Sequence, residues 1–199
     1  MGTPGASGNF SYTAKVVDSV NSSVTSSCSL NISPQSSSSV VSIWNNLVTP
    51  ETPFMSSSPV NVGIKFRSDI NGFITGMRFY KGFGNNGTHT ASLYSSAGTL
   101  LAQATFSGET ASGWQQVNFS SPVSIGANTT YVASLFTTTG YAVNFGYLTG
   151  KGVDNAPLHA LASGVDGGNG VYAYGSSPQL PWATYADSNY WVDIVFMSN

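Results

Sequence analysis

Charged residues are scarce in this sequence. They make up 7% of the 199 residues, against about 25% in a typical soluble domain. The net charge is −2, and the six basic residues are scattered along the chain: Lys15, Lys65, Arg67, Arg78, Lys81 and Lys151. Nucleic-acid binding requires a concentrated basic surface that displaces counterions from phosphates, so we expect no nucleic-acid partner. Ser, Thr, Asn and Gly take the place of the charges, as is common in secreted all-β proteins.

Cysteine pairs and long apolar runs are also missing. The single cysteine, Cys28, excludes an internal disulfide and a cysteine-based metal cluster, and its alternating position predicts a small buried side chain. No run of about 18 apolar residues occurs, so we expect no membrane insertion. The opening "MGTPGASG" lacks the charged and apolar regions of a signal peptide. We therefore expect a fragment of a longer exported chain that carries the signal, located outside the cell or at its surface.

The residue patterns of hydrolytic enzymes are absent too. There is no G-x-S-x-G motif, and only His89 and His159 could act as imidazole bases. Alternation puts His89 on the same strand face as Ala91 and Leu93, which predicts a buried structural role. His159 is expected to pack against a neighbouring loop. No two carboxylates show the pairing that glycoside hydrolysis needs, so we predict that the protein is not an enzyme.

Short alternating segments separated by turn residues run along most of the chain. Ten such segments after residue 40 predict strands, at 41–47, 61–67, 72–80, 90–95, 99–106, 114–119, 130–137, 141–147, 171–174 and 189–197. Only "APLHALA" (156–162) suggests a helical turn. The pattern predicts an all-β fold, an antiparallel β-sandwich of jelly-roll type with at most one short helical turn.

The first 34 residues follow a different pattern. Two alternating strands over residues 9–32 flank the turn "DSVNSS". Two strands cannot bury a core by themselves, and this piece resembles the last two strands of a bacterial immunoglobulin-like repeat. We therefore expect a partial immunoglobulin-like segment at 1–34, a Ser-rich linker at 35–40 and a β-sandwich domain at 41–199, with neighbouring immunoglobulin-like domains in the parent chain.

One long stretch of the sandwich domain carries a more specific resemblance. Residues 63–119 read "GIKFRSDINGFITGMRFYKGFGNNGTHTASLYSSAGTLLAQATFSGETASGWQQVNF". They are similar to the bacterial family called domain of unknown function 4082, as are "TTYVASLFTTTGYAVNFGY", "GKGVDNAPLHALASGVDGGNGVYAYG" and "NYWVDIVF". The resemblance implies a β-sandwich of large exported bacterial proteins, often found beside immunoglobulin-like repeats and carbohydrate-active modules.

Calcium is the metal that the loops would suit best, because it accepts carboxylate, amide and carbonyl oxygens. The candidate ligands are Asp154, Asp166 and Asp193. However, "VDGGNG" (165–170) fits neither the EF-hand order nor the calcium-binding β-helix repeat. For Asp193 the alternative is a buried carboxylate in hydrogen bonds or an ion pair, since buried charge must be paired. Arg67 and Arg78 are the candidate ion-pair partners for Asp69 and Asp193. No cofactor is required, and a structural calcium remains a hypothesis.

Aromatic residues gather late in the sequence, after the glycine-rich loop. Aromatic rings can stack on the C–H faces of sugars while nearby polar groups donate and accept hydrogen bonds. Pro178 and Pro181 should hold the loop after 175 outside a central strand. The candidate binding residues are Trp182, Tyr185, Tyr172, Tyr174, Asp166, Asn169, Asp187 and Asn189.

These features predict a non-catalytic extracellular accessory module that binds polysaccharide or cell-surface glycan. The alternative is a structural or adhesive spacer or tip domain without glycan binding. A coplanar exposed pair among the four candidate aromatic rings would favour the first hypothesis, and burial of all four would favour the second.

Overall fold

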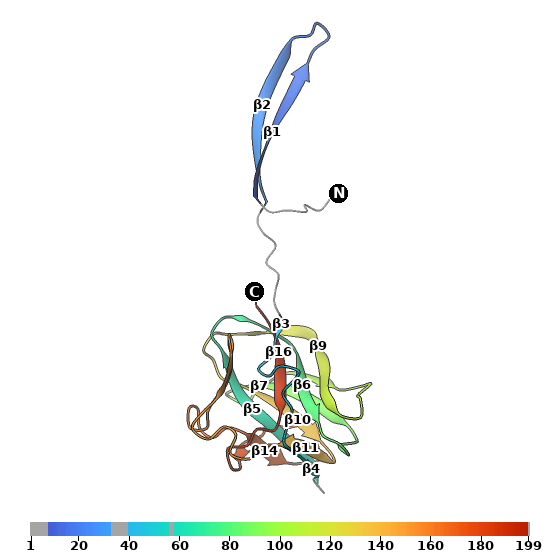
Figure 1. The fold of residues 1–199 in the computed structure, drawn as a ribbon, viewed down its shortest axis with the longest axis vertical. Helices are drawn as coiled ribbons and strands as arrows, with labels where there is room; N and C mark the ends of the chain where they lie inside the picture. Colours follow the sequence, from blue (N-terminus) through green and yellow to red (C-terminus); the bar gives the residue numbers. More distant parts are fainter. Residues whose placement is uncertain (1–7, 33–39, 56–57, 199) are drawn as a thin grey trace. The chain divides into compact units, whose positions relative to one another are not determined.

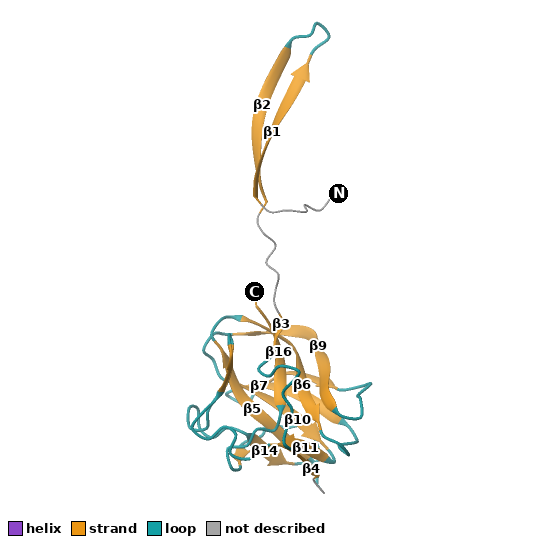
Figure 2. Ribbon diagram, viewed as in Figure 1, coloured by secondary structure: helices purple, strands orange, loops and turns teal. Residues whose placement is uncertain are grey.

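The computed structural model describes residues 8–32, 40–55 and 58–198. The chain divides into two compact units, Met1–Ser38 and Ser39–Asn199, which we call the hairpin unit and the sandwich unit (Figure 1). The linker predicted over residues 35–40 lies outside the described residues except for Val40. The described residues contain strands, turns and loops but no helix (Figure 2), and therefore none that is long and apolar enough to cross a membrane.

The hairpin unit consists of β1 (Gly8–Val17) and β2 (Ser23–Ile32), paired antiparallel. Its turn is fixed by Asp18, whose Oδ1 accepts hydrogen bonds from the backbone N–H groups of Val20 (2.9 Å) and Ser22 (2.8 Å). Cys28 lies opposite Tyr12 in the register and is exposed. The prediction that Cys28 is buried is therefore wrong, because a two-stranded hairpin has no second layer to cover either face.

The sandwich unit contains two large antiparallel sheets and one two-stranded ladder. In the first, the order is β12 (Val153–Asn155), β13 (Leu158–Ala160), β5 (Val60–Ser68), β10 (Tyr131–Thr137), β7 (His89–Ser95) and β8 (Leu100–Thr105), and β14 (Val171–Tyr174) pairs with β5 and with β15 (Ala183–Thr184). In the second, the order is β3 (Val40–Val41), β16 (Val192–Ser198), β6 (Gly72–Lys81) and β9 (Gly113–Ile125). A separate ladder joins β11 (Gly140–Val143) to β4 (Thr52–Met55). The predicted antiparallel all-β sandwich is confirmed.

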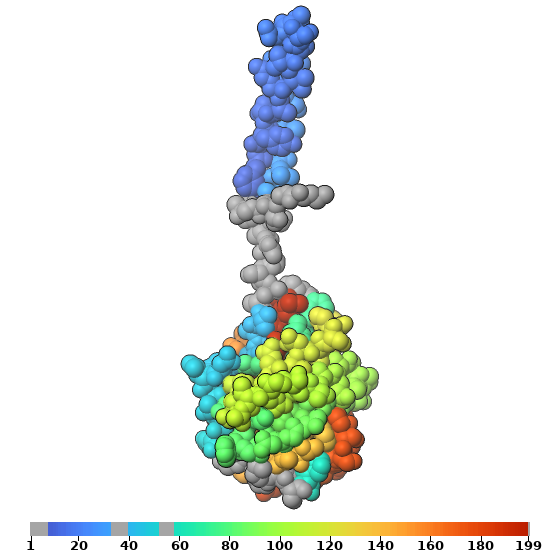
Figure 3. Space-filling view, turned by 90° about the vertical axis from the view of Figure 1, so that its right-hand side faces the viewer, coloured from blue at the N-terminus to red at the C-terminus, as the bar shows by residue number. Residues whose placement is uncertain are grey.

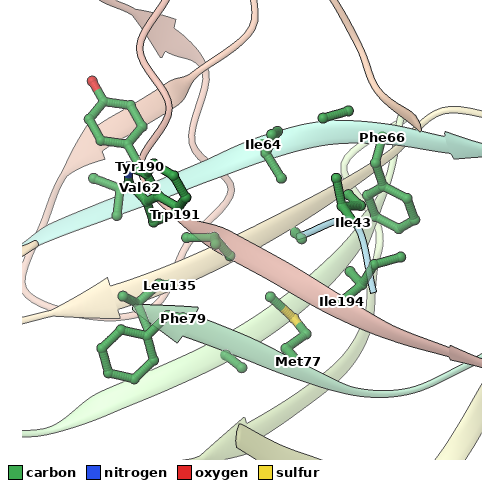
Figure 4. Close-up of a cluster of buried hydrophobic side chains, with 14 of the residues drawn as sticks. Ile43, Val62, Ile64, Phe66, Met77, Phe79, Leu135, Tyr190, Trp191 and Ile194 are labelled. Atoms are coloured by element: carbon green, nitrogen blue, oxygen red, sulfur yellow. The ribbon is translucent and has the colours of Figure 1, made fainter. Parts of the chain in front are cut away.

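The core lies between the two sheets. Alternate residues of β5, including Val62, Ile64 and Phe66, point toward Ile194 of β16 and Met77 of β6, and all are almost fully buried (Figure 4). The period of two in these strands therefore matches the buried face. Along one side, β8 contacts β9, so the edges of the two sheets meet there; in Figure 3 these segments appear light green to yellow.

Several segments differ from the predicted secondary structure: the strand predicted over 141–147 ends at Val143, and β4, β12 and β15 were not predicted. Two further differences have a clear physical reason. The strand predicted over 41–47 ends at Val41, because the next backbone N–H groups, those of Ile43 and Trp44, donate to the Asp193 carboxylate instead of to a strand. The helical turn suggested over 156–162 is strand β13. Leu158 and Ala160 are buried and alternate with the half-buried His159, and β13 pairs with β5. Tertiary pairing therefore decides the conformation of this short apolar segment.

A buried ion pair joins the second sheet to the segment after β3. The Arg78 guanidinium on β6 donates to Asp193 Oδ2 on β16 at 2.6 Å and to the Trp44 carbonyl at 2.6 Å. The other carboxylate oxygen accepts from the backbone N–H groups of Ile43 (2.9 Å) and Ile194 (2.8 Å). Burial raises the pKa of the Asp193 carboxyl, and the Arg78 charge opposes that shift. The predicted Arg78–Asp193 pair is confirmed.

Replacing Asp193 should destabilise the sandwich strongly. In Asp193→Asn the Arg78 charge stays buried without a counter-charge, which costs about 3–5 kcal/mol of unfolding free energy. Urea denaturation of the chain, followed by tryptophan fluorescence, measures this loss. The control is Glu51→Gln, which changes an exposed carboxylate and should alter stability by less than about 0.5 kcal/mol. Equal small losses in both variants would contradict a structural role for the pair.

Candidate binding site

An aromatic pocket of about 380 Å³ opens at one end of the sandwich unit. It lies beside β11 and β14, at the end opposite β3, at the bottom of Figure 1. Its lining residues come from β11, from the turn after β11, from β14, from the loop after β15 and from the residues before β16: Tyr141, Phe145, Tyr172, Tyr174, Tyr185 and Tyr190. We call this set the aromatic pocket.

The rings of the pocket form three edge-to-face pairs. The centroids of Tyr141 and Tyr190 are 5.4 Å apart with an interplanar angle of 81°, and those of Phe145 and Tyr185 are 5.8 Å apart at 83°. Tyr172 and Tyr174 are 5.8 Å apart at 78°. This is the arrangement that aromatic quadrupoles favour. The rings therefore make walls at steep angles rather than one flat platform.

The pocket has a buried floor and an exposed rim. Tyr190 is only 4% exposed and forms part of the floor, whereas Phe145, Tyr174 and Tyr185 are 57%, 62% and 62% exposed. Exposed aromatic rings beside a concavity carry apolar surface that a ligand can cover. The geometry therefore offers ring surface at the rim and closed space behind it.

The β-ladder explains how β14 contributes two rings. Tyr172 and Tyr174 pair with Val62 and Val60 of β5, so both tyrosines share the face that β5 turns toward the core. From this face the two tyrosines line the pocket. Side chains alternate between the two faces of a strand, so positions 172 and 174 fall on the same face. This alternation alone predicts that the two tyrosine rings lie side by side.

Backbone hydrogen bonds lock together the two loops that carry Phe145 and Tyr185. Asn144 and Asn189 exchange backbone bonds of 3.0 and 2.9 Å, and Gly146 N–H donates to the Ala186 carbonyl at 2.7 Å. Asn144 Oδ1 also accepts from Trp191 Nε1 at 2.8 Å, inside the core. The edge-to-face pair therefore stands on loops that are fixed to each other and to the core, a preorganised arrangement.

The polar groups identified in the pocket are tyrosine hydroxyls. Burial raises the pKa of Tyr141 to about 12, and it also raises the pKa of Tyr190. A raised tyrosine pKa favours the neutral phenol, so these hydroxyls stay protonated at physiological pH and can both donate and accept hydrogen bonds. The described lining thus consists of aromatic rings that carry no charge, and its polar groups are the tyrosine hydroxyls.

The family model described as "Domain of unknown function (DUF4082)" matches residues 47–192, most of the chain and most of the sandwich unit. The chain belongs to the DUF4082 family. A comparison with curated proteins found no match.

The DUF4082 fold brings together part of the predicted binding set. Tyr172, Tyr174 and Tyr185 all line the pocket. Trp182 is 79% exposed but is not among the lining residues identified. Ala183 pairs with Tyr172, so these two side chains point to the same face of the sheet. Trp182 precedes Ala183 and therefore points to the opposite face, away from the pocket. Because the rings meet edge to face, the coplanar pair that would have favoured stacking is not formed by Tyr172 and Tyr174.

Three lining residues were not among the predicted ligands: Tyr141, Phe145 and Tyr190. Tyr141 and Tyr190 lie in alternating strand patterns, which also suit core residues, and Phe145 follows β11 in a turn. Their shared location depends on the pairing of Asn144 with Asn189, 45 positions along the chain. No local sequence signal encodes that contact.

Two predicted ligands, Asn169 and Asn189, are buried and structural, so their assignment as surface ligands is wrong. Asn169 donates through Nδ2 to the carbonyls of Lys65 (3.0 Å) and Leu161 (2.7 Å), and its Oδ1 accepts from Lys65 N–H (2.8 Å). Asn189 Oδ1 accepts from the Trp191 N–H at 2.9 Å. The Asn169 amide therefore holds its loop to β5, and the Asn189 side-chain oxygen satisfies a buried backbone N–H group just before β16, because buried backbone groups need partners.

The glycine-rich loop is a tightly fastened connection. Gly170 has φ of +72°, and a Cβ there would lie 1.9 Å from the Ser188 carbonyl oxygen, so only glycine fits. Asp166 holds the other end, because its carboxylate binds Arg67 (3.1 Å) and accepts the Thr130 hydroxyl. The Thr130 hydrogen bond, followed by Arg67, lowers the pKa of Asp166. Arg67 therefore pairs with Asp166 and not with Asp69 as predicted.

The three candidate calcium ligands do not form one site. Asp193 is a buried partner of Arg78, Asp166 binds Arg67 and Asp154 binds the imidazole of His159 at 2.7 Å. Each carboxylate thus faces a basic group, the opposite of what a calcium site requires. In the part of the chain that the structure describes, no three His, Cys, Asp or Glu side chains gather as a metal site. The assignment of Asp193 as a calcium ligand is wrong.

Both histidines have structural partners. His89 is fully buried, as predicted, and contacts Glu109 through Nδ1 and Asn85 through Nε2. His159 Nδ1 lies 2.7 Å from Asp154, and its Nε2 lies 2.9 Å from Asp69. The hydrogen bond with Asp154 raises the pKa of His159, and Asp69 adds to the shift. The His159 imidazole therefore links the β12–β13 hairpin to the turn after β5.

The His159 contact should make stability depend on pH. Because the folded-state pKa of His159 is raised, its contribution is fully present below the unfolded value of about 6.5 and is lost as pH rises through the folded value. We expect the stability difference between the wild-type protein and His159→Gln to be largest below about pH 6.5 and to shrink as the pH is raised above that value. Urea titrations at pH values on both sides of about 6.5 measure it. Asp154→Asn, which keeps the imidazole, should reduce the pH dependence, and an unchanging difference would refute the ionic link.

Proposed function

We propose that this DUF4082 domain is a non-catalytic module that binds polysaccharide or cell-surface glycan in the aromatic pocket. The observation that carries the proposal is the exposed rim of Phe145, Tyr174 and Tyr185 around a concavity of about 380 Å³. Sugars present apolar C–H faces and many hydroxyls, so aromatic surface interspersed with phenolic hydroxyls complements both. The volume falls at the lower end of the about 300–1,000 Å³ typical of small-ligand sites.

The position of the pocket supports a role in recognition. It lies at the end of the sandwich unit opposite β3, where the unit begins (Figure 1). Its walls come largely from loops and strand ends on a rigid two-sheet scaffold, as is usual for binding sites. The surface rich in hydroxyls and amides and poor in charge suits an accessory module of a larger exported bacterial protein. Neighbouring immunoglobulin-like domains would then present it outside the cell.

Several contacts support binding rather than catalysis. His89 is inside the core, and His159 lies between two aspartates in the β12–β13 region. The polar atoms identified in the pocket belong to tyrosines, whose raised pKa at Tyr141 disfavours general-base chemistry near neutral pH. The pocket thus has surface for recognition without an activated nucleophile among its identified residues.

Removing a rim ring should weaken glycan binding. We expect Tyr174→Ala and Tyr185→Ala each to lower affinity by about tenfold, equivalent to about 1.4 kcal/mol, while both variants stay folded because these side chains are more than half exposed. The matched control is Trp182→Ala, which removes a more exposed ring that is not among the identified lining residues.

A glycan array and pull-downs with insoluble polysaccharides provide the measurement, with isothermal titration on any ligand found. Binding that is lost in Trp182→Ala but retained in Tyr174→Ala would place the site elsewhere. A complete lack of binding to every glycan would reject the proposal and favour a structural or adhesive spacer. The edge-to-face packing of the rings would then be explained as a cap on the end of the sandwich.

A further inference from the structure

We infer that the aromatic pocket selects uncharged sugar units and excludes uronic acids, sialic acids and sulfated sugars. The inference rests on the proposed function and specifies its ligand class. It follows from the positions of the few charged side chains of the sandwich unit and from the groups that each of them contacts.

Anionic sugars are normally held by arginine or lysine, because a carboxylate or sulfate taken from water must be paired. The identified lining of the pocket contains neither residue. Its phenols are neutral, and burial moves Tyr141 and Tyr190 further from ionisation. A bound carboxylate would therefore meet ring surface and hydroxyls but no cation among these six residues.

Four of the lysine and arginine side chains of the sandwich unit bind structural partners outside the identified pocket lining. Arg78 is buried against Asp193, and the largely buried Lys81 binds Glu109 at 2.8 Å. Arg67 and Lys65 both hold the glycine-rich loop at Asp166, the first through the carboxylate and the second through the backbone carbonyl at 2.7 Å. Releasing any of these to grip a ligand would break a structural contact.

Lys151 is the remaining lysine or arginine of the sandwich unit. Its Nζ lies 6.0 Å from the centroid of the Tyr147 ring, and neither residue belongs to the identified lining. The loop that carries the Tyr185 ring bears a negative charge instead. Asp187 follows Tyr185 by two residues, and hydrogen bonds from Ser163 and Thr149 lower its pKa. An ionised carboxylate there repels an anionic ligand, although salt screens the effect at this exposed position.

The ring geometry also disfavours an organic cation such as choline. A quaternary ammonium group requires several ring faces directed at one point. In each edge-to-face pair, one ring face is covered by the edge of its partner. A sugar needs only one free face for stacking, together with hydroxyl partners, and the rim tyrosines offer both.

Matched ligand pairs test this inference on the full chain. Methyl glucoside against methyl glucuronide of the same anomeric configuration, and methyl-esterified polygalacturonate against polygalacturonate, differ in charge but little in shape, and choline chloride serves as the cationic probe. We expect the neutral member of a recognised pair to bind at least about tenfold more tightly, a difference of about 1.4 kcal/mol. We also expect its affinity to be unaffected by salt, since no ion pair forms.

A variant with an added charge provides the decisive comparison. Tyr174→Lys places a cation at the exposed rim and should shift preference toward the anionic member, whereas Trp182→Lys should not. Equal or tighter binding of the anionic sugar by the wild-type chain, lost in Tyr174→Ala, would overturn the charge inference but leave glycan binding intact. Choline binding at the pocket with no sugar binding would overturn both, as would an absence of binding to every sugar tested.

Discussion

The carboxylate of Asp193 imposes the main constraint on this fold, because it is buried on the outer face of the second sheet, beneath the segment after β3, and a buried charge must be neutralised in place. Arg78 supplies the opposite charge from the neighbouring strand, and the backbone N–H groups of Ile43 and Trp44 complete the shell. The segment after β3 therefore turns toward the core instead of continuing as a strand. One ionised group thus fixes β6, β16 and the entry of the chain into the sandwich.

Contacts continue from this ion pair to the aromatic pocket. The Arg78 guanidinium lies 4.5 Å from the centroid of the Trp114 ring, and Trp114 packs against Trp191 at 6.3 Å. Trp191 in turn donates through Nε1 to Asn144, whose backbone joins the two loops that carry Phe145 and Tyr185. The rim rings therefore stand on a continuous packed network. Such support keeps a site preorganised, since each ring is held before any ligand arrives.

Sequence patterns predict what depends on local periodicity. They place β14 at 171–174, put Tyr172 and Tyr174 on one face, bury His89 and pair Arg78 with Asp193. They fail where distant segments meet. Asn169 and Asn189 look like surface amides in Gly- and Ser-rich stretches, yet the topology buries them as anchors. Trp182 looks like the central ligand residue, but the register of β15 with β14 puts it beside a different face. Because side chains alternate along a strand, an error of one residue in the register places a side chain on the opposite face.

The glycine-rich loop shapes the aromatic pocket through the contacts that anchor it. Asn169 fixes the loop to β5 through both backbone groups of Lys65, and the missing side chain of Gly170 lets it approach Ser188 closely. Ser188 lies in the same loop as Tyr185, so this approach sets where the rim ring stands. Fold membership alone does not specify a ligand. In this domain the proposed preference for neutral sugars follows from the location of the charges: Arg67 and Lys65 hold the glycine-rich loop, and the identified lining of the aromatic pocket contains no charged side chain.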